Sequence, residues 1–285
     1  MPYNDVFTDL NMDNPVTGAM PTRCHGCSAE EKCRSIERHM LVFPKPKHTR
    51  LMIISESPHA YGLRRPVDIA RVGVGQSECC RDENYEMFMA TMRSILANRT
   101  KRRSNSMPVD IFDLVSRLID LDRLGTKGDV YWTHVHKRSI VRDPAIKKTD
   151  QDEEEWCKKR FDGCLDRFLM DEIRSLRPEA VVIISFRGLK FLTGDGLIHV
   201  SREMTKMISN NPDGITFTEL IAHMGSQIPA GRKNVLEAIG SSEIFVLPNP
   251  GNNPHQTRFY RKEEVEIEFS RLLEWETNRI LSIYK

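Results

Sequence analysis

The chain has 285 residues, enough for one large α/β domain or two small ones, with 39% hydrophobic and 29% charged residues. No uninterrupted apolar run is long enough to span a bilayer, and the N-terminus lacks the basic-then-apolar pattern of a signal peptide. We therefore expect a cytoplasmic protein that makes no membrane contact. The net charge is only +2, so any nucleic-acid-binding surface must be local. Seven cysteines, an odd number, fit a reducing compartment where thiols bind metal or pack.

The chain begins with residues 1–22, which are rich in Asn, Asp and Pro and are expected to form a loosely ordered lead-in. Four later runs are short, apolar and β-branched, which is typical of buried strands. These runs are Leu51–Ser55, Val130–Val135, Ala180–Phe186 and Ile244–Leu247.

Helical periodicity separates these runs. Apolar residues share one helix face from Tyr85 to Leu96, and again from Phe161 to Leu176, where the helix should stop before Pro178. A long closing helix is expected from Glu263 onward.

Strands that alternate with helices predict an α/β fold, a three-layer αβα arrangement around a central, four-stranded, mostly parallel sheet. We expect residues 23–285 to form a single domain with an insertion at about 196–242.

Ligands of open parallel sheets bind at the carboxyl ends of the strands, so the loops that follow the predicted strands are the candidate ligand-binding segments. The loop Ser55–Pro58, Ser-Glu-Ser-Pro, resembles the Gly-Glu-Ala-Pro-Gly motif of the iron–sulfur branch (family 4) of uracil-DNA glycosylases. Leu247–Gly251, Leu-Pro-Asn-Pro-Gly, is more similar to the Leu-Pro-Asn-Pro-Ser motif of the mismatch-specific branch. Val130–Lys137, Val-Tyr-Trp-Thr-His-Val-His-Lys, resembles the family-4 run Val-Tyr-Ile-Thr-Asn-Val-Val-Lys, and Cys164–Ile184 is similar to the segment after it.

The resemblance covers roughly Cys24 to His255 and implies a fold like that of uracil-DNA glycosylases. It also implies a monofunctional DNA glycosylase, an enzyme that flips a base out of DNA and hydrolyses its N-glycosidic bond. We expect DNA as the partner and a monomeric protein. Three alternatives stay open: a uracil-DNA glycosylase of DNA repair, an inactive DNA-binding protein of the same fold, and an enzyme that modifies bases without leaving an abasic site.

Three residues are the candidates for catalysis. Glu56 is expected to orient water and offset positive charge on the sugar. The alternative is that Glu56 is an exposed loop residue without a catalytic role. Asn249 would donate to the departing base or hold the water, and His255 is a second donor from the same loop. Asn before Pro is also an ordinary turn former, and a His in a polar loop is often only exposed.

The candidate base pocket departs from the family. The family-4 Asn that reads the pyrimidine edge is replaced by His134, whose ring cannot reproduce an amide's bidentate pattern. In the family, the aromatic residue that stacks on uracil follows a Pro. Here Val67 follows Pro66, and Tyr61 is the candidate replacement. The remaining base-binding candidates are Ser57, Pro58 and Gly251, of which Ser57 and Gly251 are small. We therefore expect a modified or bulky pyrimidine in place of plain uracil, which would suit defence against viruses that carry such bases.

Basic and aromatic residues near these loops are candidates for binding DNA. They are Arg64, Arg65, Lys101, Arg102, Arg103, Arg258, Phe259 and Tyr260. Charge runs are also typical of solvated faces, and the two aromatics could instead pack inward.

Cys24 and Cys27 have the close spacing of metal ligands, and Cys33 follows. The resemblance implies a [4Fe-4S] cluster, but the family's third ligand position is Arg138 here. Cys33 would then supply the third thiolate and Cys164 the fourth, with Cys157 as the alternative. Structural zinc and buried free thiols remain open.

Overall fold

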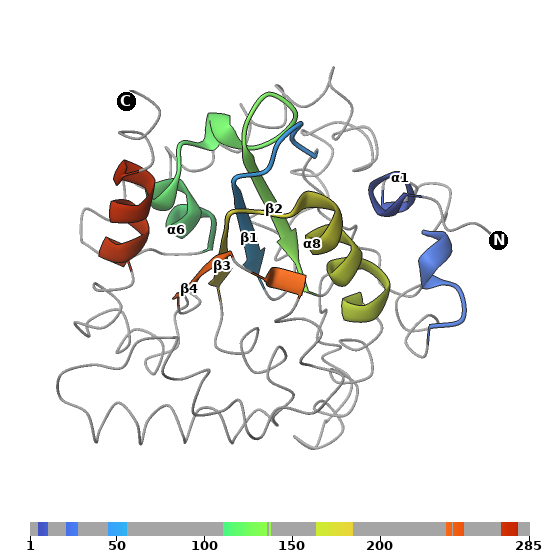
Figure 1. Ribbon diagram of the computed structural model, residues 1–285. Coiled ribbons are helices and arrows are strands. Elements are labelled where there is room, and N and C mark those ends of the chain that lie inside the picture. The colour runs from blue at the N-terminus through green and yellow to red at the C-terminus, as the bar shows by residue number, and fades with distance from the viewer. Residues whose placement is uncertain are drawn as a thin grey trace, which may run out of the picture. The chain divides into compact units, whose positions relative to one another are not determined.

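The computed structural model describes residues 5–10, 21–27, 45–55, 111–135, 137, 164–184, 238–240, 242–247 and 269–278 (Figure 1). Four strands lie within this part of the chain: β1 (Leu51–Ser55), β2 (Val130–His134), β3 (Ala180–Ile184) and β4 (Glu243–Leu247). Each agrees within two residues with a predicted strand.

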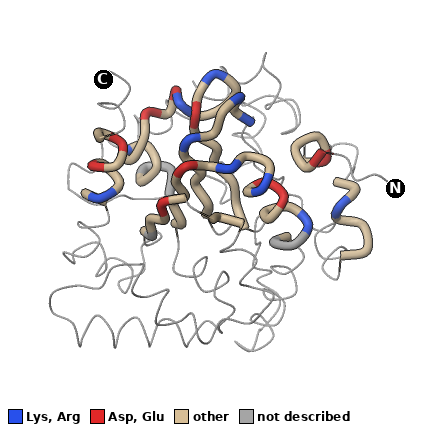
Figure 2. The backbone as a smooth tube through the Cα atoms, in the orientation of Figure 1, with Lys and Arg blue, Asp and Glu red and all other residues tan. Residues whose placement is uncertain are grey.

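Strands β1, β2 and β3 are buried on both faces, whereas β4 is partly exposed, with Glu243 exposed and Ile244 half-buried. Every residue of β1, β2 and β3 is buried. Glu243 is the one Lys, Arg, Asp or Glu residue in the four described strands; Figure 2 colours these residue types along the backbone. Continuous burial of this kind is typical of parallel sheets covered on both faces. The four-stranded sheet has the order β2-β1-β3-β4, and the described pairs are parallel. The prediction of an α/β fold with a parallel sheet is confirmed at this level.

Contacts divide the chain into two compact units, residues 1–104 with 122–179 and residues 105–121 with 180–285. In the first unit, β1 pairs with β2 from Leu51 opposite Val130 to Ser55 opposite His134. In the second unit, β3 pairs with β4 from Ala180 opposite Glu243 to Ile184 opposite Leu247. The predicted single domain and its insertion at 196–242 stay predictions, since most of that segment lies outside the described residues.

A tight turn before β2 fixes the register of the first pair. Asp129 accepts hydrogen bonds at its carbonyl from the backbone amides of Arg50 and Leu51, at 2.8 and 3.2 Å. Its carboxylate is held by the guanidinium of Arg123, whose Nε and Nη2 donate to the two oxygens at 2.7 and 3.0 Å. Between them Gly128 passes so close to the backbone that a Cβ there would lie 1.8 Å from the Arg123 carbonyl oxygen.

The first unit also contains α1 (Val6–Leu10), within the stretch expected to be loosely ordered. Its apolar side chains are buried, and the Phe7 ring meets the Tyr131 ring edge-on with centroids 5.7 Å apart. The fully buried Asp9 carboxylate accepts hydrogen bonds from the backbone amides of Thr22 and Arg23 at 2.7 and 3.0 Å. Helix α1 is therefore tied to the 3-10 helix η1 (Thr22–Cys24).

The predicted helix before Pro178 is present as two segments, the π-helical turn η3 (Leu165–Leu169) and α8 (Met170–Leu176). It ends at Arg177, which takes the left-handed conformation, with φ 45°, and donates its amide to the Ile173 carbonyl at 2.9 Å. The end before Pro178 is confirmed.

In the second unit, α6 (Ile111–Leu118) buries Leu114, Val115 and Leu118. The predicted closing helix is present over residues 269–278. Its Trp275 meets the Phe245 ring edge-on at 6.2 Å. No described helix is both long enough and apolar enough to cross a bilayer.

We predict that Gly128→Ala strongly destabilises the first unit. The added Cβ meets backbone, which cannot move aside as a side chain would, so the cost should be about 3 kcal/mol or more. Chemical denaturation measures the free energy of unfolding. Lys127→Ala, at the exposed neighbouring position, is the control and should change stability by less than about 0.5 kcal/mol. Equal effects of the two substitutions would contradict the steric account.

Candidate functional site

The carboxyl ends of β1 and β2 place Ser55 beside His134, and both residues are 1% exposed. The Ser55 Oγ lies 2.5 Å from His134 Nδ1. The indole Nε1 of Trp132 donates to the same Oγ at 3.0 Å. The chain leaves β2 through Val135, whose amide donates to the Ser55 carbonyl at 2.8 Å. These bonds hold the His134 ring at the carboxyl edge of the strand pair, where ligands of parallel sheets bind.

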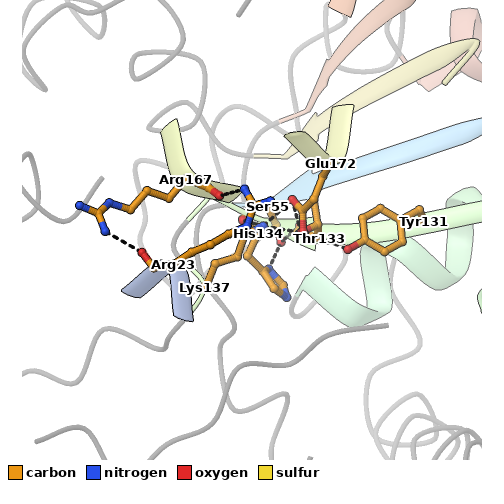
Figure 3. A network of polar contacts seen from close by, with 8 residues as sticks. All are labelled: Arg23, Ser55, Tyr131, Thr133, His134, Lys137, Arg167 and Glu172. Atoms are coloured by element: carbon orange, nitrogen blue, oxygen red, sulfur yellow. Dashed lines mark hydrogen bonds and ion pairs between the residues drawn. The ribbon is translucent and has the colours of Figure 1, made fainter. Parts of the chain in front are cut away.

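On the other face of β2, the buried carboxylate of Glu172 accepts hydrogen bonds from the side chains of Tyr131, Thr133 and Lys137 (Figure 3). Glu172 is fully buried on α8. Tyr131 donates its hydroxyl to Glu172 Oε1 at 3.0 Å, and Thr133 donates its Oγ1 to the carboxylate at 3.2 Å. Because side chains alternate along a strand, Tyr131 and Thr133 share one face of β2 and Trp132 and His134 share the other.

Lys137 neutralises this carboxylate and links it to the loop after β2. Lys137 is 3% exposed, and its Nζ lies 2.6 Å from Glu172 Oε2. The same ammonium donates to Thr133 Oγ1 at 2.7 Å and to the His134 carbonyl oxygen at 2.8 Å. All three ammonium protons therefore have acceptors, which is the condition under which a buried ion pair is tolerated. The backbone of His134 is thus fixed from α8 while its ring is fixed from β1.

We predict that removing either partner of this ion pair is costly and that removing both is less costly than the sum. Lys137→Met and Glu172→Gln should each destabilise the protein by about 3–5 kcal/mol, because each leaves a buried charge or dipole uncompensated. The double variant removes both charges, so a double-mutant cycle should show a clear coupling energy.

The control for this cycle lies on the same helix. Arg174 is 58% exposed at its side chain and lies 3.8 Å from Asp171, so Arg174→Met should cost less than about 1 kcal/mol. Additive energies for Lys137 and Glu172 would contradict the network described here.

The loop that carries Cys24 and Cys27 is bound to η3 by two arginines (Figure 3). Arg167 donates to the carbonyls of Arg23, His25 and Gly26 at 2.7, 2.8 and 3.0 Å. In return, Arg23 donates to the Arg167 carbonyl at 2.8 Å and pairs with the Asp171 carboxylate. Gly26 has a φ of 69°, a conformation that a side chain would strain.

These contacts bear on the predicted metal ligands. Cys24, Cys27 and Cys164 are half-buried thiols outside any disulfide, and Cys164 lies one turn before Arg167 on the same helical segment. Among the residues that the structure describes, no three Cys, His, Asp or Glu side chains are arranged to hold a metal ion. Cys33, and Cys157 as the alternative to Cys164 for the fourth ligand, lie outside the described residues, so the ligand set stays a prediction.

Of the other predicted site residues, the structure describes His134 alone. The catalytic candidates Glu56, Asn249 and His255 lie outside the described residues. So do the base-binding candidates Ser57, Pro58, Tyr61 and Gly251, and the DNA-binding candidates Arg64, Arg65, Lys101, Arg102, Arg103, Arg258, Phe259 and Tyr260. Their roles stay predictions.

Sequence reasoning missed Ser55, Trp132, Lys137, Glu172 and Arg167. One available indication was that Glu172 shares the helix face of Phe168 and Leu176, at intervals of four residues. An acidic residue on an apolar helix face needs a buried partner. The indication for Lys137 was weaker: it is the last residue of Val130–Lys137, the run that resembles family 4. No pattern in the sequence distinguished Ser55 or Arg167.

No protein-family model matches the chain, and a search of curated proteins finds no match.

Proposed function

We propose that this protein is a monofunctional DNA glycosylase with a three-layer fold like that of uracil-DNA glycosylases. It excises a modified or bulky pyrimidine and leaves an abasic site, a reaction suited to antiviral defence. The observation that carries the proposal is the contact between Ser55 and His134. It brings together the start of the Ser-Glu-Ser-Pro loop and the position at which family 4 reads the base, at the edge of the sheet where ligands bind.

In this proposal the residues beyond each strand perform the chemistry. Glu56, the residue after Ser55, orients the water and offsets the positive charge that develops on the sugar. Asn249, two residues after the end of β4, donates to the departing base, and His255 is the second donor. Ser57, Pro58, Tyr61, His134 and Gly251 form the base pocket.

DNA is held by the basic and aromatic candidates that flank these loops. Arg64, Arg65 and Lys101–Arg103 contact phosphates, and Arg258–Tyr260 fill the space of the flipped base. We propose that the protein acts as a monomer in the cytoplasm.

The test is a panel of DNA duplexes followed by detection of abasic sites. The panel carries normal bases, uracil, 5-hydroxymethyluracil, 5-hydroxymethylcytosine or glucosylated 5-hydroxymethylcytosine at one position. We expect excision of a modified pyrimidine, and we expect Glu56→Gln to lower the rate by about 100-fold or more while DNA binding persists.

Each other outcome of the panel favours an alternative. Excision of uracil alone would favour a repair enzyme and end the modified-base proposal. Tight DNA binding without abasic sites on any duplex would favour a binding protein, and a changed base without an abasic site would favour a modifying enzyme.

We further propose a [4Fe-4S] cluster held by Cys24, Cys27, Cys33 and Cys164, with zinc as the alternative metal. Thiolates are suitable ligands for either. The Cys-x-x-Cys loop is bound to the helical segment of Cys164 by Arg167, which supports a common site. The cluster would pin the N-terminal segment to the first unit, and no catalytic step is assigned to it.

Anaerobic purification followed by assays for iron, inorganic sulfide and zinc tests this cofactor. We expect iron and sulfide in equal amounts, lost in Cys24→Ser and in Cys164→Ser. Cys79→Ser, at a cysteine with no counterpart in the family, is the control and should keep the metal. Loss of iron in Cys157→Ser but not in Cys164→Ser would reassign the fourth ligand, and zinc without iron would replace the cluster.

A further inference from the structure

The backbone of the loop that carries Cys24 and Cys27 is held by hydrogen bonds of the chain itself. Each carbonyl oxygen from Pro21 to Gly26 accepts one. The carbonyls of Pro21, Thr22 and Cys24 accept from amides three residues further along, at 2.9, 3.1 and 3.1 Å. The remaining carbonyls, which are the three between Arg23 and Gly26 other than that of Cys24, accept from the guanidinium of Arg167.

The guanidinium of Arg167 binds these three carbonyls at once. Its Nη1 donates to the carbonyls of Arg23 and His25 at 2.7 and 2.8 Å, and its Nη2 donates to the Gly26 carbonyl at 3.0 Å. Because Nη1 carries two protons, each of its two bonds has a proton of its own. A rigid, planar fork of donors is a property of Arg that the ammonium of Lys does not share.

Arg167 reaches the loop from the helical segment that carries Cys164. It is the middle residue of the π-helical turn η3 (Leu165–Leu169), which follows Cys164 directly. Such turns are rare and occur frequently at functional sites. Four residues after Arg167, Asp171 pairs with the Arg23 side chain. The Cys-x-x-Cys loop is therefore bound to the segment of Cys164 at two places.

We propose that Arg167 is a positioning residue that sets the backbone of Cys24 and Cys27 for metal binding before a metal is bound. The inference rests on the proposed thiolate site of Cys24, Cys27, Cys33 and Cys164. The donor chemistry fits that site, since the described thiols are half-buried, lie outside any disulfide and are suitable ligands for an iron–sulfur cluster or zinc. Arg167 contacts carbonyl oxygens of the loop, so its effect on metal binding passes through the loop conformation.

A loop that is ordered in advance lowers the conformational entropy that metal binding must remove. Ordering the backbone of each residue costs entropy, and here hydrogen bonds of the folded chain provide the order. Ligands held in their bound conformation bind more tightly for this reason. In the opposite case, a segment without such bonds becomes ordered only when the metal binds. The two cases differ in the metal-free protein, where they can be told apart.

Hydrogen exchange of the metal-free, reduced, full-length protein tests the order of the loop. We expect the amides of residues 22–27 to exchange at least about tenfold more slowly than in an unstructured peptide. Arg167→Met should remove this protection while β1 and β2 stay protected. Arg174→Met, at a side chain that is 58% exposed on the same helical segment, is the control and should change neither. An unprotected loop in the unsubstituted protein would overturn the proposal.

The effect on metal binding is measured with Co²⁺, whose bonds to thiolates absorb in the near ultraviolet. Metal-free protein is titrated anaerobically, and the part of the signal that is lost in Cys24→Ser is assigned to this site. We expect Arg167→Met to weaken Co²⁺ binding by about 10-fold to 100-fold, the usual effect of removing a residue that orients metal ligands. Arg174→Met should bind Co²⁺ like the unsubstituted protein. Unchanged affinity in Arg167→Met would refute the positioning role.

Arg167→Lys separates the geometry of the guanidinium from its charge. The ammonium keeps the charge but is a point donor on a flexible stem, so we expect Co²⁺ binding to be weakened nearly as much as in Arg167→Met. Full recovery with Lys would show that charge, and not the fork of donors, is what the loop requires.

Gly26→Ala disturbs the loop without changing Arg167, and it tests the proposal even if Arg167→Met fails to fold. Nothing lies within 4 Å of the added Cβ, but the φ of 69° is strained for a residue with a side chain. We expect weaker Co²⁺ binding and faster exchange of the loop amides. Unchanged affinity would contradict the requirement for this loop conformation.

The outcomes distinguish this inference from the proposed function. If the unsubstituted protein binds no Co²⁺ through Cys24, the positioning role is overturned together with the proposed cofactor. Base excision by that metal-free protein would leave the proposed glycosylase activity standing. Conversely, metal binding that depends on Arg167 in a protein that excises no base would support the positioning role and contradict the glycosylase.

Discussion

The buried carboxylate of Glu172 is the group around which the first unit is arranged. A carboxylate at zero exposure is tolerated only when its charge is paired and its oxygens are hydrogen-bonded, and here Lys137, Tyr131 and Thr133 meet both conditions. The requirement fixes α8 against β2 at a defined register, because the hydroxyls of alternate strand residues must both reach one carboxylate. The Lys137 ammonium that neutralises Glu172 also donates to the His134 carbonyl. The ion pair therefore also positions the end of β2.

The same helical segment serves two sides of the unit. Its residues Phe168 and Glu172 are buried, and Glu172 bonds to β2, whereas Arg167 and Asp171 bind the loop of Cys24 and Cys27. A displacement of this segment would therefore disturb both the strand end that carries His134 and the proposed cluster loop. Arg167 alone donates to three carbonyls of this loop, so the loop is bound to the helical segment by hydrogen bonds of the chain itself.

The sequence predicted the strands well because burial on both faces leaves a continuous apolar run, which is visible without a structure. The end of α8 was also predictable, since Pro178 follows it directly. Helix α1 was not, because five residues are too few for a periodic pattern and its order depends on Asp9 capturing amides 13 and 14 residues away. The Ser55–His134 contact could not be predicted from the sequence either. It joins residues 79 apart, and only the pairing of β1 with β2 brings them together.

Ser55, Trp132 and His134 are joined in one hydrogen-bonded unit at the carboxyl ends of β1 and β2. With Gly at position 55, the Trp132 indole N–H and His134 Nδ1 would each lose their Ser55 partner. Each buried polar atom left unsatisfied costs about 1–3 kcal/mol. The Ser55 hydroxyl is therefore a shared partner of the Trp132 indole and the His134 ring, and it also lies 3.4 Å from the Thr133 carbonyl oxygen. On the opposite face of β2, Tyr131, Thr133, Lys137 and Glu172 form a separate hydrogen-bonded network.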